Sequence, residues 1–343
     1  MGERKIRNME EFAALSGISR PTVSKYFNDP DSVRKSTRAR IEAALARYEY
    51  RPNIYAMNQN RRLTKTVGIV VPYLADPFFA EIARNIERMI IDAGFSPILF
   101  SAHGAPSFEV EILDTLRSLK PAGVLLAPLG RASDRAVVEK FCADVPTVLF
   151  DSNIADLGEA FIGSDNDQSI ALIVEYLCRS GTPPRFFEMA TPTNPNANRR
   201  RAAYLRVMAA LGHTPHCIKV PGSGWDFEEI GFREGLRLFQ DGSITAGTIL
   251  CSNDRLAIGL LAAAFEHGLP VGRADSCPLR IAGHDDHPFA RFTCPSLTTV
   301  AQDYASIAER SVETLFARIE SGASGAVRAT TLFAGRLVER ASA

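Results

Sequence analysis

Carboxylate and amide side chains recur in this sequence directly after apolar runs, where buried strands would end. They are Asp76, Asp151, Asp165, Asn253, Asp254, Asp285 and Asp286. Such groups can bind the hydroxyls of a polar ligand through paired hydrogen bonds. Each can also cap the helix that follows without touching any ligand. We expect capping roles for Asp167 and Asp254, and a ligand cleft where the other side chains gather.

A second set of side chains suits a different partner. Arg20, Pro21, Ser24 and Lys25 fall on the polar face of a short predicted helix, near its N-terminal end. An arginine at this point of a recognition helix can pair with a guanine edge through two hydrogen bonds. A solvated basic helix in a small helical adaptor would carry the same residues, so the helix alone leaves both interpretations open.

Signatures of catalysis and of metal binding are weak in this sequence. It contains no G-x-S-x-G elbow, phosphate-binding loop or dinucleotide fingerprint. His284 and His287 flank two aspartates, but no further Cys or His cluster completes a zinc set. We therefore expect a protein that is not an enzyme, holds no metal and needs no cofactor.

The distribution of charge separates the two sets of side chains. The formal net charge is zero, but residues 1–65 contain 14 Lys and Arg against 7 Asp and Glu, whereas the remainder contains 25 against 32. A basic head on an acidic body suggests a polyanionic partner for the head. The six cysteines are widely spaced, and neither a signal peptide nor a membrane-spanning run is evident. We expect reduced thiols in a cytoplasmic protein.

Three short helices are predicted to position the basic set. The first begins at a capping box of Asn8 and Glu11 and ends near Gly17. The second begins after Ser19, and the third spans about 37–49. Apolar residues at helical spacing predict one shared core, made by Phe12, Leu15, Ile18, Val23, Phe27, Ile41, Ala44, Leu45 and Tyr48.

From residue 66 onward, short apolar runs alternate with amphipathic helical patterns. The rhythm occurs twice, first in TVGIVV, SPILFS and VPTVLFD and then in AFIGSD, RFFEMA and GTILCSND. Strands that alternate with helices predict parallel sheets covered on both faces. The predicted fold class is therefore an all-α head followed by two doubly wound α/β subdomains. Ligands of such sheets bind beyond the carboxyl ends of the strands.

The segment from Met9 to Asn53 closely resembles the helix-turn-helix head of the lactose- and galactose-repressor (LacI/GalR) family. Its specific parts are a G-I-S-x-x-T-V-S core and a Y-x-P-N ending. The resemblance implies base contacts from Arg20, Pro21 and Lys25. It also implies contacts to phosphates or nearby groups from Thr22, Ser24 and Asn28.

The same resemblance implies a hinge helix over residues 53–59 that lies in the minor groove of operator DNA. Asn53 and Ala56 fit that pattern. Gln59 stands where the family normally has a leucine wedged between central base pairs, and Arg34 stands where a serine often caps the third helix. A glutamine would lose apolar contact with the unstacked step, so we make no prediction of a wedge at this position.

The resemblance extends over nearly the whole body, through YLADPFFAEIARNIE, LCSNDRLAIGLLAAAFEHGLPVG, IAGHDD and PSLTTVAQD. It implies a periplasmic-binding-protein-like sensor in which aromatic rings stack on a sugar while polar groups bind its hydroxyls. Trp225 and Phe227 both lie near the point where the family has an aromatic cleft residue, and the indole is the better stacking surface. The effector residues implied are Asp76, Phe78, Phe79, Asp151, Arg200, Trp225, Asn253, Asp285 and Gln302.

The expected organisation has a head at 1–52, a hinge at 53–63 and a sensor at 64–343. Within the sensor, the N-subdomain comprises about 65–164 and 296–326, and the C-subdomain about 165–295 and 327–343. The resemblance implies a homodimeric repressor of carbohydrate genes that binds a near-palindromic operator and responds to a small sugar. Two alternatives remain: a sugar-binding protein without regulatory DNA binding, and a regulator that senses a nucleobase or nucleoside. The first would require a signal peptide and no basic head.

Overall fold

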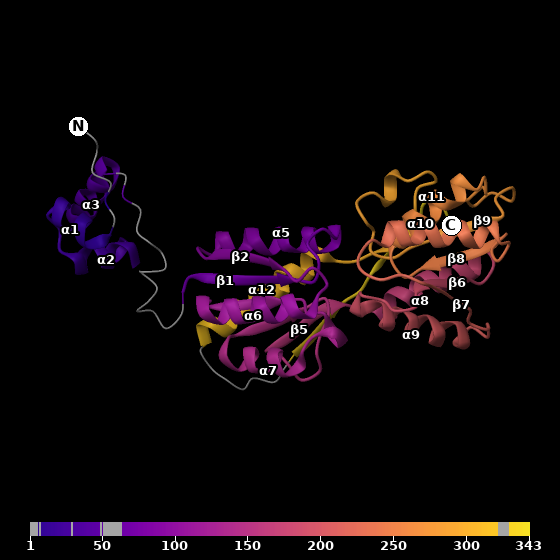
Figure 1. Cartoon of the computed structure of the whole chain (residues 1–343), viewed down its shortest axis with the longest axis horizontal. Helices are drawn as coiled ribbons and strands as arrows, with labels where there is room; N and C mark the ends of the chain where they lie inside the picture. The colour runs from indigo at the N-terminus through magenta and orange to yellow at the C-terminus, as the bar shows by residue number, and fades with distance from the viewer. Residues whose placement is uncertain (1–5, 7, 29, 49, 51–63, 322–328) are drawn as a thin grey trace. The chain divides into compact units, whose positions relative to one another are not determined.

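The computed structural model describes residues 6, 8–28, 30–48, 50, 64–321 and 329–343 (Figure 1). The chain divides into two compact units, Met1–Thr64 and Lys65–Ala343. In the part of the chain just defined, no helix has the length and apolar character needed to cross a membrane. The six cysteines all lie in that part and are free thiols.

The first unit contains the three predicted helices. They are α1 (Met9–Ser16), α2 (Arg20–Asn28) and α3 (Lys35–Tyr48), with a 3₁₀ turn at Pro30–Ser32 between the last two. Asn8 caps α1 by accepting the amide N–H of Glu11 at 2.9 Å, and Gly17 ends the helix in the left-handed conformation, with φ of 62°. Glycine adopts that conformation without a steric penalty, so α1 begins and ends where the sequence predicts.

The core of this unit differs from the prediction at one position. Phe12, Val23 and Ile41 are fully buried, but Leu15 is 49% exposed. The ring of Tyr50, from beyond α3, stacks on Phe12 with 4.8 Å between ring centroids. Helical periodicity could not foresee this partner, because Tyr50 lies outside all three helices.

The second unit contains two doubly wound subdomains, which confirms the predicted fold class. The sheet of the N-subdomain has six parallel strands in the order β11-β5-β4-β3-β1-β2. These strands are β1 (Thr66–Val71), β2 (Ser96–Ser101), β3 (Gly123–Leu126), β4 (Thr147–Phe150), β5 (Ala160–Ser164) and β11 (Ala329–Phe333). One face is covered by α5 (Pro77–Asp92) and α12 (Tyr304–Ser321), and the other by α6 (Pro106–Leu119) and α7 (Arg135–Asp144) (Figure 1).

The C-subdomain has a four-stranded parallel sheet in the order β7-β6-β8-β9. These strands are β6 (Arg185–Met189), β7 (Cys217–Val220), β8 (Gly247–Cys251) and β9 (Leu279–Ala282). Helices α8 (Asn166–Ser180) and α9 (Pro195–Ala210) pack on one face, and α10 (Phe227–Gln240) and α11 (Asp254–Glu266) on the other. An antiparallel ribbon of β10 (Thr299–Ala301) and β12 (Arg336–Val338) lies beside α8.

Strand pairing places two subdomain boundaries later than predicted. The strand β10 pairs with β12 of the C-subdomain, and β11 pairs with β5 of the N-subdomain, so the chain crosses after Ala301 and after Phe333. The predicted boundaries were near 296 and 327. Strand β11 is an edge strand in which Ala329, Thr330 and Leu332 are exposed, so it lacks the continuous apolar run typical of a buried parallel strand.

Candidate functional site

The surface of α2 carries the side chains predicted to meet DNA. Val23 is buried in the core, which turns the opposite side of the helix toward solvent. The Arg20 side chain is 62% exposed, and its nearest acidic partner, Glu10, lies 3.7 Å away and is itself exposed. Such a pair contributes little, so the guanidinium can exchange it for a base or a phosphate. The residues that share this surface, all exposed or half-buried, are Arg20, Pro21, Thr22, Ser24 and Lys25.

Ser19, the residue before α2, forms hydrogen bonds with the first turn of that helix. The hydroxyl of Ser19 lies 2.8 Å from that of Thr22 and accepts the amide N–H of Thr22 at 3.4 Å. At α3, the carbonyl of Arg34 accepts the amide N–H groups of Thr37 and Arg38, whereas its guanidinium has no acceptor with which to cap the helix. The N-terminal amides of a helix favour a nearby phosphate, so the helix end suits the same partner as its basic side chains.

Part of the predicted DNA-binding set lies outside the described residues. This applies to Asn53 and Ala56, and to the side chain of Asn28, whose backbone ends α2. Gln59, for which no contact is predicted, also lies outside them. The hinge therefore stays a prediction.

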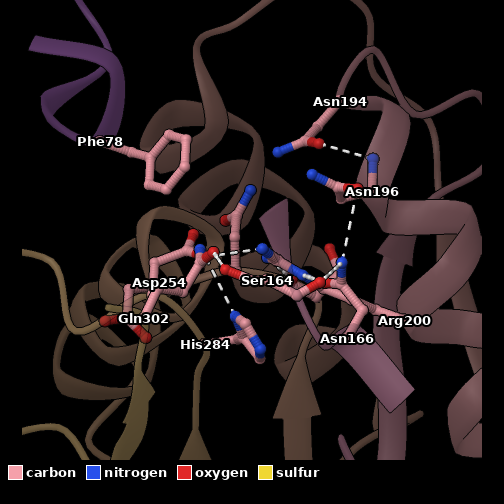
Figure 2. A network of polar contacts seen from close by, with 12 residues as sticks. Phe78, Ser164, Asn166, Asn194, Asn196, Arg200, Asp254, His284 and Gln302 are labelled. Atoms are coloured by element: carbon pink, nitrogen blue, oxygen red, sulfur yellow. Dashed lines mark hydrogen bonds and ion pairs between the residues drawn. The ribbon is translucent and has the colours of Figure 1, made fainter. Parts of the chain in front are cut away.

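A buried polar network in the sensor is centred on Arg200 of α9 (Figure 2). Its side chain is 2% exposed. It donates from Nε to Asn166 Oδ1 at 3.0 Å, from Nη1 to the carbonyl of Ser252 at 2.8 Å, and from Nη2 to Asp285 Oδ1 at 2.8 Å. Three different segments thus fix the orientation of one guanidinium, as a rigid binding site requires.

The carboxylate of Asp285 joins this network to the crossovers between the subdomains. Its Oδ1 accepts from Gln302 Nε2 at 2.6 Å and lies 3.0 Å from His284 Nδ1. Ser164, at the end of β5, donates to Gln302 Oε1. Burial alone would raise the pKa of Asp285, but Arg200 and His284 lower it below its usual value. The charged carboxylate is therefore the stable form.

His284 supplies a neutral imidazole to this arrangement. Burial and the nearby Arg200 lower the pKa of His284 to about 4, which outweighs the opposite effect of Asp285. A neutral ring can donate from Nδ1 to Asp285, and its Nε2 has no hydrogen-bond partner among the described residues.

Asp151 approaches the same network from the N-subdomain. It follows β4 with φ of 59°, and Asn196 donates to its Oδ1 at 2.9 Å and to its carbonyl at 3.2 Å. Its Oδ2 is buried and has no partner in the described part of the chain. Burial raises the pKa of Asp151 to about 7, even though Arg200 and Arg199 oppose the change. An unpaired buried oxygen costs stability and is a ready acceptor for a ligand hydroxyl.

Asp76 belongs to a separate ion-pair cluster. It caps α5 by accepting the amide N–H of Phe78 at 3.0 Å, and Arg255 of α11 donates to its Oδ2 at 3.2 Å. The same guanidinium binds both carboxylate oxygens of Glu228 at 2.7 Å. Burial raises the pKa of Asp76, and Arg255 partly opposes this. The cluster joins the two subdomains at a second point.

The aromatic residues predicted to bind the effector are all buried and belong to one hydrophobic core. Phe78 is 9% exposed, and its ring meets Phe79 and Tyr304 edge to face, with centroids 4.9 and 5.2 Å away. Figure 2 shows the Phe78 ring to one side of the polar network. Phe79 is 1% exposed and packs inside the α5 core. Trp225 is 4% exposed and lies against other rings.

The capping predictions were wrong by one or two positions. Asn253, predicted to bind the effector, caps α11 by accepting an amide N–H at 2.8 Å. Asp254 is fully buried within α11, accepts a hydroxyl and a backbone amide, and has its pKa raised to about 8 by burial. Asp165, and not Asp167, caps α8. Runs of adjacent Asp and Asn offer several possible caps, and only backbone geometry selects among them.

Several residues of the network escaped sequence reasoning. The sequence gives one indication that Arg255 belongs to the site, because it directly follows the Asn253-Asp254 pair at a strand end. Tyr304 follows Gln302 by two residues, and its hydroxyl donates to the Asp285 carbonyl. Asn166 and Asn196 lie in ordinary polar runs that give no signal.

A cavity of about 360 Å³ lies at the crossover, apart from the predicted effector residues. Its walls include Asn153, Phe161, Arg199, Arg206 and Leu332. Both arginines already have partners, because Arg199 donates to Asn153 and Arg206 pairs with Asp167 at 2.5 Å. The network around Arg200 is the better chemical candidate for a ligand. In the residues that the structure covers, no group of three or more His, Cys, Asp or Glu could hold a metal ion.

Two family models match this chain. Residues 8–53 match the bacterial regulatory proteins of the lacI family, and residues 168–343 match the periplasmic binding protein-like domain. The first match covers the three-helix unit, and the second covers most of the C-subdomain together with α12 and the end of the chain.

Characterised relatives match over nearly the whole length. The ribose operon repressor of Escherichia coli K12 is 27% identical over 317 residues, which cover 91% of this chain and 92% of the relative. The sucrose operon repressor of Pediococcus pentosaceus is 26% identical over 91% of this chain and 92% of its own. The crystal structure of the lac repressor dimer bound to operator and the anti-inducer ONPF superposes with a TM-score of 0.81 at 24% identity, covering 99% of both chains.

Proposed function

Because this chain belongs to the LacI family of bacterial regulatory proteins, we propose that it is a homodimeric transcriptional repressor controlled by a small sugar. One observation carries the proposal. The chain combines a basic α2 surface, exposed in a family-matched head, with a buried Arg200–Asp285 network between two sensor subdomains. The first suits DNA, and the second suits a polyhydroxylated ligand.

We assign DNA recognition to residues 1–52 and a minor-groove hinge to residues 53–63. Arg20, Pro21 and Lys25 would face bases, whereas Thr22, Ser24 and Asn28 would contact the backbone. A dimer places two recognition helices in successive major grooves about 34–36 Å apart, so the operator should be nearly palindromic. Asn53 and Ala56 would contact the minor groove between the half-sites.

We assign effector binding to the cleft of the sensor, residues 64–343. Arg200, Asp285 and the unpaired Asp151 Oδ2 would bind hydroxyls, and Phe78 would cover an apolar face of the ring. Relatives named for ribose and sucrose operons support a carbohydrate. The remaining predicted residues, Asp76, Phe79, Asn253, Trp225 and Gln302, would line or support the cleft.

The switch would act through closure of the cleft. Gln302 and Ser164 lie where the chain crosses between the subdomains, and Gln302 also binds Asp285. A ligand that replaces one of these hydrogen bonds would favour one arrangement of the subdomains over another. The same free energy then appears as a change in operator affinity. The protein would act in the cytoplasm, where its operator lies, and would perform no catalysis.

Selection of DNA from a random pool tests the regulatory part. The purified protein should enrich a near-palindrome, and a monosaccharide that raises its melting temperature should change its affinity for that DNA. Absence of enrichment, with a sugar still stabilising the protein, would favour a sugar-binding protein without regulatory DNA binding. If the protein enriches a palindrome but only a nucleoside raises its melting temperature, the effector is a nucleoside and not a sugar.

A further inference from the structure

Trp225 links the two subdomains by aromatic contact. It lies between β7 and α10 of the C-subdomain, and its indole stacks on Tyr73 of the N-subdomain with centroids 5.3 Å apart and ring planes at 12°. The edge of Phe79 lies against it at 6.0 Å. The indole is only 4% exposed, so one of its faces is already occupied within the protein.

Gly104 makes room for this indole. A Cβ atom at that position would lie 2.2 Å from Trp225 Nε1 and 2.7 Å from Cδ1. Both distances are shorter than van der Waals contact, so any other residue would clash with the ring. Gly104 follows β2 with φ of 70°, so the N-subdomain presents bare backbone to the edge of the ring. The indole N–H has no hydrogen-bond partner in the described residues, which shows that close packing positions the ring here.

The contact continues from Trp225 back to the N-subdomain. Phe227 meets the indole edge to face at 5.6 Å, and the guanidinium of Arg255 lies over the Phe227 ring at 5.0 Å. Arg255 in turn binds Asp76 at 3.2 Å. The contacts therefore join the C-subdomain to the N-subdomain twice, at Tyr73 and at Asp76. We call this set of side chains (Tyr73, Trp225, Phe227, Arg255 and Asp76) the aromatic wall, and Asp76 also caps α5 at Phe78.

Separate contacts join the subdomains at Asp151. Asn196 holds the Asp151 carboxylate, and Arg199 donates to Asn153. The hydroxyl-binding groups, Arg200 and Asp285, belong to the network that adjoins Asp151. Ring contacts link this network to the stack. Phe79 lies against both Trp225 and Phe78, and Phe78 meets Tyr304, whose hydroxyl donates to the Asp285 carbonyl.

We propose that the Trp225–Tyr73 stack determines effector size, and restricts this sensor to a single sugar ring. The inference rests on the proposed function and specifies its ligand class. Monosaccharides enter beside the wall, and disaccharides are rejected because they must break it.

The wild-type protein provides the first test. Trp225 is the only tryptophan in the chain, so its emission reports directly on the wall. Titration with D-ribose, D-glucose and D-fructose, and with sucrose and maltose, should show at least one monosaccharide binding about tenfold or more tighter than either disaccharide. Tighter binding of a disaccharide overturns the inference and leaves the proposed function intact. Absence of binding by any carbohydrate overturns the sugar effector itself, and the inference fails with it.

Glycine variants provide the second test. Gly104→Ala should expel the indole, shift its emission to longer wavelength and improve disaccharide affinity about tenfold relative to the monosaccharide. Gly94→Ala is the matched control, because its φ is 76° and a Cβ there meets no atom within 4 Å. Equal behaviour of the two variants overturns the proposal.

Trp225 variants, followed by calorimetry, separate a size filter from a structural role. Trp225→Ala should relax the preference as Gly104→Ala does, and Trp225→Phe should largely restore it. Thermal unfolding of each variant followed by circular dichroism verifies that the sensor is folded. A folded Trp225→Ala protein that still rejects disaccharides overturns the proposal.

Discussion

The α2 surface and the sensor cleft use arginine in opposite ways. Arg20 is 62% exposed, with one weak partner, whereas Arg200 is 2% exposed and donates to three acceptors. An exposed guanidinium exchanges water for a base at little cost to folding. A buried one is part of the fold, and a ligand must fit the hydrogen bonds that already exist. Loss of function in the head should therefore be separable from stability, and loss of function in the cleft should not.

The largest effect is expected from Arg200→Ala. Removal of one partner leaves Asp285 buried without its main compensating charge, which costs about 3–5 kcal/mol in the free energy of unfolding. Urea unfolding followed by Trp225 fluorescence measures this directly. The exposed pair of Arg206 and Asp167 supplies the control, because Arg206→Ala should cost less than about 1 kcal/mol. If Arg200→Ala and Arg206→Ala lowered the free energy of unfolding equally, burial would not distinguish the arginines of this protein.

Arg20→Ala should affect recognition and leave unfolding unchanged. Loss of a bidentate base contact should cost about 1–3 kcal/mol of discrimination at one base pair in each half-site. Binding to a set of operators mutated one position at a time measures the effect. Arg47→Ala, an exposed arginine of α3, should preserve base preference. A uniform loss of affinity across all sequences would show that Arg20 contacts phosphate only.

Asp151→Asn should change the pH dependence of sensor stability. The pKa of Asp151 is about 7 in the folded protein and about 3.9 when unfolded, so the folded state holds this proton more tightly. Its stabilising contribution is complete below pH 4 and declines as the pH rises to about 7.

Asparagine stays neutral, so between pH 5 and 8 the variant should lose about 2–3 kcal/mol less than the wild type in the free energy of unfolding. Urea unfolding at the two pH values measures this difference. The exposed carboxylate of Asp114 provides a control, since Asp114→Asn should follow the wild type. A variant as pH-sensitive as the wild type would show that other groups, such as Asp254, account for the whole dependence.

The same contrast explains what the sequence could predict. The head depends on short-range rules, such as the Asn8–Glu11 capping box and Gly17, and its helices appear where these signals stand. The alternation of strands and helices likewise predicts both doubly wound sheets. The predicted start of the last C-subdomain segment, near 327, differs from the structure because β11 pairs with β5, and this pairing joins residues far apart in the chain.

The buried network of the sensor depends on distant partners, which sequence reasoning identifies only in part. Arg200 and Asp285 were both named, but nothing in their local sequence shows that they bind each other. The ligand role of Asn253 stays a prediction, and local sequence does not show that its side chain caps α11. Asn196 was missed because its role exists only beside Asp151, 45 residues away. Polar residues in a buried network acquire their function from the fold, and their type and spacing are insufficient to predict it.

The smallest effect comes from removing one helix cap in each unit. Asn8→Ala deletes the side chain that accepts the Glu11 amide, and Asp134→Ala deletes the acceptor of two amides at the start of α7. Each should cost about 1 kcal/mol locally. Because the two units have separate cores, Asn8→Ala should accelerate hydrogen exchange in α1 and weaken operator binding without moving the Trp225 transition. Asp134→Ala should lower the Trp225 transition and leave exchange in α1 unchanged. If either cap altered both readouts, the head and the sensor would share one cooperative transition, and recognition could not be separated from stability even at α2.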